Sequence, residues 1–243
     1  MPRRAHTPLL ALLLATLLFA GSSCSGGRPP LAYLSLGDSL AVGVGASDPP
    51  ERGYAPLYEA RLERETGREV NLVQLGVSGE TSESFIGSYP DPSASQLARA
   101  EAFLRRNPGA LVTLSLGGND LLQAERGPGR RREAALEEFG ENLDRILSTL
   151  GRASKPAPRI SVLLLYSPDP GGPADRWTAR MNAEILACAA RHGAAVANAP
   201  ELFRGREEEY LRPHDVHPTD AGYRALARAF ERAEPVPSGP DAG

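Results

Sequence analysis

Apolar and polar positions along this chain follow two recurring patterns. Short apolar runs bounded by turn residues predict buried strands, and longer segments with apolar residues three or four positions apart predict amphipathic helices. The predicted strands span residues 31–36, 70–75, 110–116, 159–166 and 194–198. The predicted helices span residues 54–65, 96–106, 131–150, 174–191 and 220–233. Because strands and helices alternate, we expect an α/β fold, a three-layer α/β/α sandwich around a five-stranded parallel sheet.

The first residues follow a different pattern. Arg3 and Arg4 precede an apolar segment over residues 9–20, and small residues follow it. This order is typical of a bacterial secretory signal peptide, and the apolar part is short for a membrane span, although a permanent anchor helix is the alternative. We therefore expect an exported protein with a signal peptide over 1–23, a tether over 24–30, one domain over 31–233 and a disordered tail over 234–243.

The two cysteines have different surroundings. Cys24 directly follows the expected signal peptide, and its segment resembles a bacterial lipoprotein signal, in which this cysteine becomes the lipidated N-terminus. Gly21 stands three residues earlier, where such signals usually carry an aliphatic residue, so a membrane-anchored lipoprotein and a secreted protein cleaved nearby both stay open. Cys188 lies in an apolar helical segment and favours a buried small hydrophobe. Two unrelated cysteines predict neither a disulfide framework nor a metal site.

Composition and charge exclude several classes of partner. A chain of 243 residues suits one sizeable α/β domain, and its net charge of −3 gives no reason to expect a nucleic-acid partner. Gly43-Val44-Gly45 lacks the third glycine of a dinucleotide-binding motif. Asp38 and Asp120 favour loop-organising hydrogen bonds over metal ligation, so we expect no cofactor and no metal. The oligomeric state stays open.

The candidate chemistry lies at the strand ends. Right-handed crossovers bring the carboxyl ends of parallel strands to one edge, where open α/β sheets bind ligands. The blocks at this edge are Gly37-Asp38-Ser39-Leu40, Gly76-Val77-Ser78-Gly79-Glu80-Thr81, Gly117-Gly118-Asn119-Asp120 and, before the last helix, His214-Asp215-Val216-His217-Pro218. A hydroxyl, backbone and amide donors and a histidine are the groups that acyl transfer needs. The first block alone is equally compatible with a polar turn.

The four blocks, in this order, resemble those of the SGNH hydrolases, the GDSL esterases and lipases. The resemblance implies that Ser39 is the nucleophile and that His217 is the general base. It also implies that the N–H groups of Ser39 and Gly79 and the side-chain amide of Asn119 bind the oxyanion. The implied architecture is flavodoxin-like. The implied activity is that of a serine hydrolase, an esterase, lipase or lysophospholipase acting on a small-molecule carboxylic ester.

The chain departs from the family at the acid. The family usually has aspartate three residues before the histidine, and His214 occupies that position. Asp215 is the nearest acid, and we predict that it orients His217. The alternatives are a Ser39–His217 dyad oriented by a backbone carbonyl and an acid from elsewhere in the chain. His192 ends a predicted helix and favours a role as a helix cap.

The sequence leaves the substrate open among lipid esters, acetylated sugars, thioesters and peptidoglycan. We expect segments 82–95 and 166–177 to wall the pocket, and their few large apolar residues favour small acyl groups over long-chain lipids. Gln96 opens a predicted helix and favours a structural role, although the loop before it can border the pocket. The alternative function is a non-catalytic exported protein that binds a lipid or a glycan. The intact set of serine, glycine, asparagine and histidine argues against it, because a binding protein does not need all four.

Overall fold

The computed structural model describes residues 28–87, 91–125 and 129–233. The predicted signal peptide, Cys24, most of the predicted tether and the predicted tail lie outside the described residues. No helix within the described ranges is long and apolar enough to cross a membrane.

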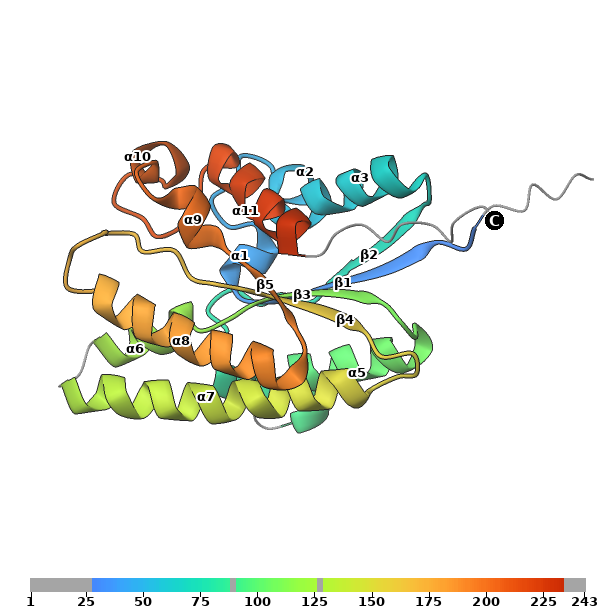
Figure 1. Ribbon diagram of the computed structural model, residues 1–243, viewed down its shortest axis with the longest axis horizontal. Helices are drawn as coiled ribbons and strands as arrows, with labels where there is room; N and C mark the ends of the chain where they lie inside the picture. Colours follow the sequence, from blue (N-terminus) through green and yellow to red (C-terminus); the bar gives the residue numbers. More distant parts are fainter. Residues whose placement is uncertain (1–27, 88–90, 126–128, 234–243) are drawn as a thin grey trace, which may run out of the picture.

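The described strands form one parallel sheet in the order β2-β1-β3-β4-β5 (Figure 1). They are β1 (Leu31–Gly37), β2 (Val70–Gln74), β3 (Leu111–Ser115), β4 (Arg159–Leu163) and β5 (Ala195–Ala197). This is the flavodoxin-like order, in which the chain starts at an interior strand, adds the edge strand β2 on one side and then adds β3, β4 and β5 on the other. Ligands of such sheets bind where the order reverses, beyond the carboxyl ends of β1 and β3. The predicted fold class is confirmed.

Two layers of helices cover the sheet, one on each face (Figure 1). The longer helices are α3 (Tyr54–Thr66), α5 (Gln96–Arg106), α7 (Gly129–Arg152), α8 (Asp175–His192) and α11 (Asp220–Ala233). Tyr33 of β1 packs into a core cluster with Tyr54 and Phe230 from α3 and α11. Leu34 belongs to the opposite cluster, which includes residues of α5, α7 and α8. Because β1 is buried on both faces, its sequence is a nearly continuous apolar run.

Several short helices follow the strands or lie in the connections. They are α1 (Ser39–Val42), α2 (Pro49–Arg52), α4 (Ser82–Ile86), α6 (Gly118–Glu125), α9 (Ala199–Phe203) and α10 (Glu207–Tyr210), with a 3₁₀ turn, η1 (Pro92–Ala94). The sequence pattern did not predict them, because so few turns show little hydrophobic periodicity. Helices α1 and α6 begin directly after β1 and β3, so they hold Ser39 and Asn119 in their first turns at the carboxyl edge of the sheet.

Candidate active site

Ser39 lies on a sharp turn between β1 and α1. Gly37, at the end of β1, has φ of +121°, and a Cβ added there would lie 1.8 Å from the carbonyl oxygen of Ser115. Only glycine therefore allows β1 to end against β3 in this way. Asp38 caps α1 by accepting a hydrogen bond from the Leu40 N–H at 3.0 Å, and the same oxygen accepts one from the Ser115 Oγ of β3 at 2.9 Å. The Ser39 N–H, in the first turn of the helix, has no partner within the helix and is free for a substrate oxygen.

Asp38 and Asp120 both organise loops, as predicted. Asp38 is buried, and this burial raises the pKa of its carboxyl group to about 6 despite the hydrogen bonds that favour the charged form. Asp120 accepts hydrogen bonds from the backbone N–H and the Oγ of Ser82, at 3.1 and 2.6 Å. Burial also raises the pKa of Asp120. Asp120 thereby ties α6, which carries Asn119, to the start of α4.

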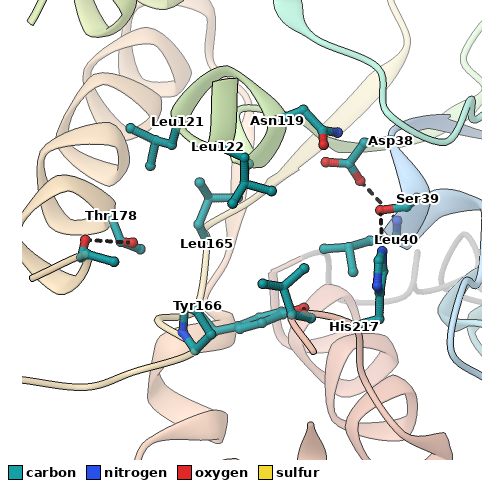
Figure 2. Close-up of a pocket in the computed structure, with 14 residues that line it drawn as sticks. Asp38, Ser39, Leu40, Asn119, Leu121, Leu122, Leu165, Tyr166, Thr178 and His217 are labelled. Carbon is teal, nitrogen blue, oxygen red and sulfur yellow. Dashed lines mark hydrogen bonds between the residues drawn. The ribbon is translucent and has the colours of Figure 1, made fainter. Parts of the chain in front are cut away.

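Ser39, His217 and Asp215 form a continuous line of hydrogen bonds. The Ser39 Oγ lies 3.0 Å from the His217 Nε2 (Figure 2), and the His217 Nδ1 lies 2.7 Å from the Asp215 Oδ1. The same carboxylate oxygen accepts the backbone N–H of His217 at 3.1 Å. Although partial burial acts to raise the pKa of Asp215, the hydrogen bonds from His217 lower it overall. A hydroxyl, an imidazole and a carboxylate in this order are the geometry of a serine–histidine–aspartate triad.

The loop before His217 explains how an acid only two residues away reaches the imidazole. His214 has a left-handed backbone with φ of 57°, which is uncommon for a residue other than glycine. Arg212 closes the loop, because its N–H donates to the His217 carbonyl at 3.0 Å and its carbonyl accepts from the Asp215 N–H at 3.1 Å. In this tight loop the Asp215 side chain turns back onto His217. The structure therefore places the Asp215 carboxylate, and not a backbone carbonyl, against Nδ1.

Tyr166 also braces the loop, a role that was not predicted from the sequence. Its Oη donates a hydrogen bond to the Val216 carbonyl at 2.6 Å. Its ring is stacked on Phe203 with the centroids 4.3 Å apart, which fixes its position. The residue preceding His217 is thus held from a second side. Its location at the end of the predicted strand over residues 159–166 was the sign in the sequence that it reaches this edge.

Asn119 and Gly79, the two further candidate oxyanion donors, are linked through Glu80. The Asn119 Nδ2 donates to the Glu80 carbonyl at 2.9 Å, which fixes the orientation of its amide and leaves a second N–H on that nitrogen. Gly79 lies in a turn closed by a 3.1 Å hydrogen bond from the Glu80 N–H to the Val77 carbonyl. Its φ of +84° suits the third position of a type II turn, where glycine is favoured.

A cavity of about 140 Å³ extends from Ser39 towards α8. Its polar end holds Ser39, Asn119 and His217, and its remaining wall is mainly apolar (Figure 2). The described lining residues are Asp38, Ser39, Leu40, Gly118, Asn119, Leu121, Leu122, Leu165, Tyr166, Pro168, Ala174, Thr178, Val216 and His217. Gly79 is not among them and lies in the neighbouring turn, while Asp215 lies behind His217.

The prediction about the pocket walls is half confirmed. Segment 166–177 contributes Tyr166, Pro168 and Ala174 to the cavity lining. None of the described residues of segment 82–95, which are 82–87 and 91–95, lines the cavity, so the prediction is wrong for these residues. Its helix α4 instead buries Phe85 in the core. Leu121 and Leu122 of α6 line the cavity instead, because the third block continues as a helix whose next turn faces the cavity.

The remaining predicted residues lie away from this site. His192 is the last residue of α8, as its predicted role at a helix end requires, and its Nε2 also lies 2.9 Å from the Oδ1 of Asp144 in α7. Cys188 is buried in α8, and burial raises the pKa of its thiol. Within the part of the chain that the structure describes, no group of three or more His, Cys, Asp or Glu side chains is placed to hold a metal ion.

Comparison with known proteins decides the family. Residues 35–225 match the GDSL-like Lipase/Acylhydrolase family, and this range includes all four sequence blocks. The chain belongs to this family. Within the GDSL-like family it is similar to the spore germination lipase LipC of Bacillus licheniformis, with 28% identity over 214 residues, 84% of this chain and 96% of LipC.

Solved structures show the same GDSL-like architecture. The lipase Lip_vut3 from a goat rumen metagenome superposes with a TM-score of 0.68 and 27% identity, over 84% of this chain and 97% of that one. The acetylxylan esterase Axe2 from Geobacillus stearothermophilus gives a TM-score of 0.65 over 84% of this chain and 94% of Axe2. Its identity is 18%, so that likeness concerns the fold alone.

Proposed function

We propose that this protein hydrolyses carboxylic esters through an acyl-enzyme formed on Ser39. The observation that carries the proposal is the line of hydrogen bonds from the Ser39 Oγ to the His217 Nε2, at 3.0 Å, and from the His217 Nδ1 to Asp215, at 2.7 Å. This line ends in a cavity that opens beside the nucleophile. Membership of the GDSL-like Lipase/Acylhydrolase family supports the same reaction.

The proposed reaction gives each group a role. The Ser39 Oγ attacks the acyl carbon while the His217 Nε2 takes its proton, and the Asp215 carboxylate stabilises the resulting imidazolium. The N–H groups of Ser39 and Gly79 and the Asn119 amide stabilise the negative charge that develops on the carbonyl oxygen. His217 then returns the proton to the departing alcohol. A water molecule, activated by the same imidazole, releases the acid and regenerates Ser39.

The alternative of a non-catalytic binding protein is not favoured. A pocket that only binds a lipid or a glycan has no need for a hydroxyl, an imidazole and a carboxylate in hydrogen-bonding sequence. The named relatives also share one type of bond as substrate, since LipC and Lip_vut3 are described as lipases and Axe2 as an acetylxylan esterase. An ester bond is the feature common to these descriptions.

The cavity supports a short acyl group as the preferred substrate. Its volume is about 140 Å³, and Leu121, Leu122 and Leu165 supply much of its wall. An engineered apolar cavity of about 150 Å³ in another protein holds one benzene molecule, so a chain of a few carbons fills a space of this size. Short acyl groups were also expected from the composition of segments 82–95 and 166–177, and described residues of 166–177 line the cavity. The apolar wall comes chiefly from α6 and the residues after β4.

Export of the protein and lipidation of Cys24 rest on the N-terminal sequence pattern. If Cys24 is lipidated, the native protein should partition into detergent, and a Cys24→Ser variant should partition into the aqueous phase. Mass spectrometry that finds an unmodified mature N-terminus at another residue would refute the anchor.

A serine-directed probe tests the proposed reaction directly. The purified protein should be labelled by a fluorophosphonate and should hydrolyse p-nitrophenyl butyrate. Ser39→Ala should lose both properties while its unfolding temperature stays close to that of the wild type, because the hydroxyl contributes little to the core. Labelling or hydrolysis that persists in the Ser39→Ala variant would show that Ser39 is not the nucleophile.

A further inference from the structure

Gln96, the first residue of α5, is joined by hydrogen bonds to the strand that carries the nucleophile. Its side chain is buried, with 3% of the residue exposed. The Gly37 N–H donates to the Gln96 Oε1 at 2.6 Å, and the Gln96 Nε2 donates to the Gly37 carbonyl at 3.0 Å. The pairing of β1 with β2 ends at Ser35, two residues before Gly37. Beyond that point the Val77 N–H still donates to the Gly37 carbonyl at 2.9 Å, whereas the Gly37 N–H is bound by the Gln96 side chain. The Gln96 amide thus completes the hydrogen bonding of the last residue of β1 next to the second block.

The same amide also binds the second block. The Gln96 Nε2 donates to the Glu80 Oε2 at 2.7 Å, and the other oxygen of Glu80 accepts a short hydrogen bond from the Ser84 hydroxyl. Glu80 is buried, with 7% of the residue exposed. One buried amide thus joins the end of β1 to the turn that contains Gly79.

All three candidate oxyanion donors connect to this pair of residues. The Ser39 N–H follows Gly37 by two residues, and Gly79 directly precedes Glu80 in the chain. The Asn119 amide donates to the backbone carbonyl of Glu80 at 2.9 Å. Neither Gln96 nor Glu80 is among the described residues that line the cavity, so neither is placed to touch a substrate.

We propose that Gln96 and Glu80 form a positioning pair that sets the relative placement of the three oxyanion donors. The proposal rests on the proposed ester hydrolysis and adds two residues that act only through Ser39, Gly79 and Asn119. Donors of this kind stabilise the transition state because they are fixed before the reaction begins. Loss of the pair should therefore lower kcat and leave KM nearly unchanged.

The first variant removes the amide. Gln96→Leu keeps a buried side chain of similar size but leaves the Gly37 N–H and the Glu80 carboxylate each without one partner. Displacement of catalytic groups by about 1 Å costs roughly 10²-fold in rate, so we expect kcat to fall by about 10- to 100-fold. Tyr33→Phe is the matched control, because Tyr33 lies in the same strand and loses one buried hydrogen bond, 3.0 Å to Thr113, without contacting the pair.

A second set of variants tests the hydrogen bond between the two side chains. Gln96→Glu alone sets one carboxylate against another, and we expect a loss of kcat at least as large as that of Gln96→Leu. In the double variant Gln96→Glu/Glu80→Gln, the amide at position 80 donates to the carboxylate at position 96, which still accepts the Gly37 N–H. The bond between the two side chains is restored in the reverse direction, although the carboxylate at position 96 cannot donate to the Gly37 carbonyl as the amide does. We therefore expect the double variant to recover part of the lost kcat, at least about tenfold over Gln96→Glu.

Butylboronic acid supplies a readout that a merely structural role would not change. The Ser39 Oγ adds to boron while its proton passes to His217, and the tetrahedral anion places an oxygen where the oxyanion forms. The affinity of the Gln96 variants for butylboronic acid should fall in parallel with kcat/KM. Tyr33→Phe should have a lower unfolding temperature but the same affinity and kcat/KM as the wild type.

Two different failures can be told apart. Absence of Ser39-dependent hydrolysis in the wild type would overturn the proposed function itself. If hydrolysis is present, the positioning role is wrong when folded Gln96→Leu keeps the kcat and the boronate affinity of Tyr33→Phe. It is also wrong when the double variant recovers nothing over Gln96→Glu.

Discussion

Replacement of Asp215 by asparagine removes a charge from behind His217 while it keeps the size of the side chain. The Asp215 Oδ1 accepts both the ring Nδ1, at 2.7 Å, and the backbone N–H of His217, at 3.1 Å. An amide oxygen can accept the same two hydrogen bonds. The substitution therefore measures what the negative charge contributes when His217 becomes an imidazolium.

The structure sets the expected size of the loss. Opposite unit charges about 4 Å apart interact by about 4 kcal/mol at an effective dielectric constant of about 20, which suits pairs near a protein surface. The Asp215 side chain is 37% exposed, so water screens the pair further. We therefore expect a loss of roughly 2–3 kcal/mol of transition-state stabilisation, which is about 10²-fold in kcat. This is smaller than the roughly 10⁴-fold loss in a protease whose aspartate is buried.

The assay compares kcat on p-nitrophenyl butyrate for Asp215→Asn and His214→Ala. His214 occupies the position of the usual family acid, but its side chain is exposed, so His214→Ala should change kcat by less than about threefold. His217→Ala should be nearly inactive, because no other group takes the proton of Ser39. Equal and small losses for Asp215→Asn and His214→Ala would refute the acid assignment and favour a dyad oriented by a backbone carbonyl.

Three further predictions follow from the site. Asn119→Ala should lower kcat by roughly 10²-fold with little change in KM, because its amide acts on charge that develops only in the transition state; an effect on KM alone would contradict this role. Burial raises the pKa of Asp38 to about 6, so the native state binds more protons than the unfolded state and stability falls as the pH rises from about 4 to 6. Urea unfolding should therefore show that the free energy of unfolding of Asp38→Asn, relative to that of the wild type, is higher by roughly 2–3 kcal/mol at pH 7.5 than at about pH 4. The same relative value at both pH values would refute the pKa shift. Among p-nitrophenyl esters, kcat/KM should rise by up to about fourfold per added methylene until the cavity of about 140 Å³ is filled and then level off; a steady rise to the palmitate would contradict the short acyl pocket.

The sheet and the long helices could be predicted because their signals are local. Helices α5 and α11 begin and end at the predicted residues, 96–106 and 220–233. The short helices α1, α4 and α6 were missed because their stability comes from packing and from caps such as Asp38 and Thr81. The composition of segment 82–95 resembled that of a loop, yet part of it is a helix that faces the core.

The candidate site was predictable in its residue types and not in its supporting contacts. Sequence spacing left the partner of His217 open, since the answer depends on the left-handed backbone of His214. The link between Gln96 and Gly37 joins residues 59 positions apart, and no local pattern encodes such a contact. For the same reason Gln96 was expected only to begin a helix.

Ser39 and His217 are 178 residues apart in the chain, one near the N-terminal and one near the C-terminal end of the domain's sequence. During synthesis on the ribosome, the nucleophile Ser39 is added early, whereas its base His217 is added near the end of the domain. A chain that stalls or is cut before residue 217 has no means to activate Ser39, however well its earlier strands pair. Ester hydrolysis is therefore a measure of chain completeness as well as of chemistry, and its recovery during refolding would report the moment at which the two ends of the domain meet.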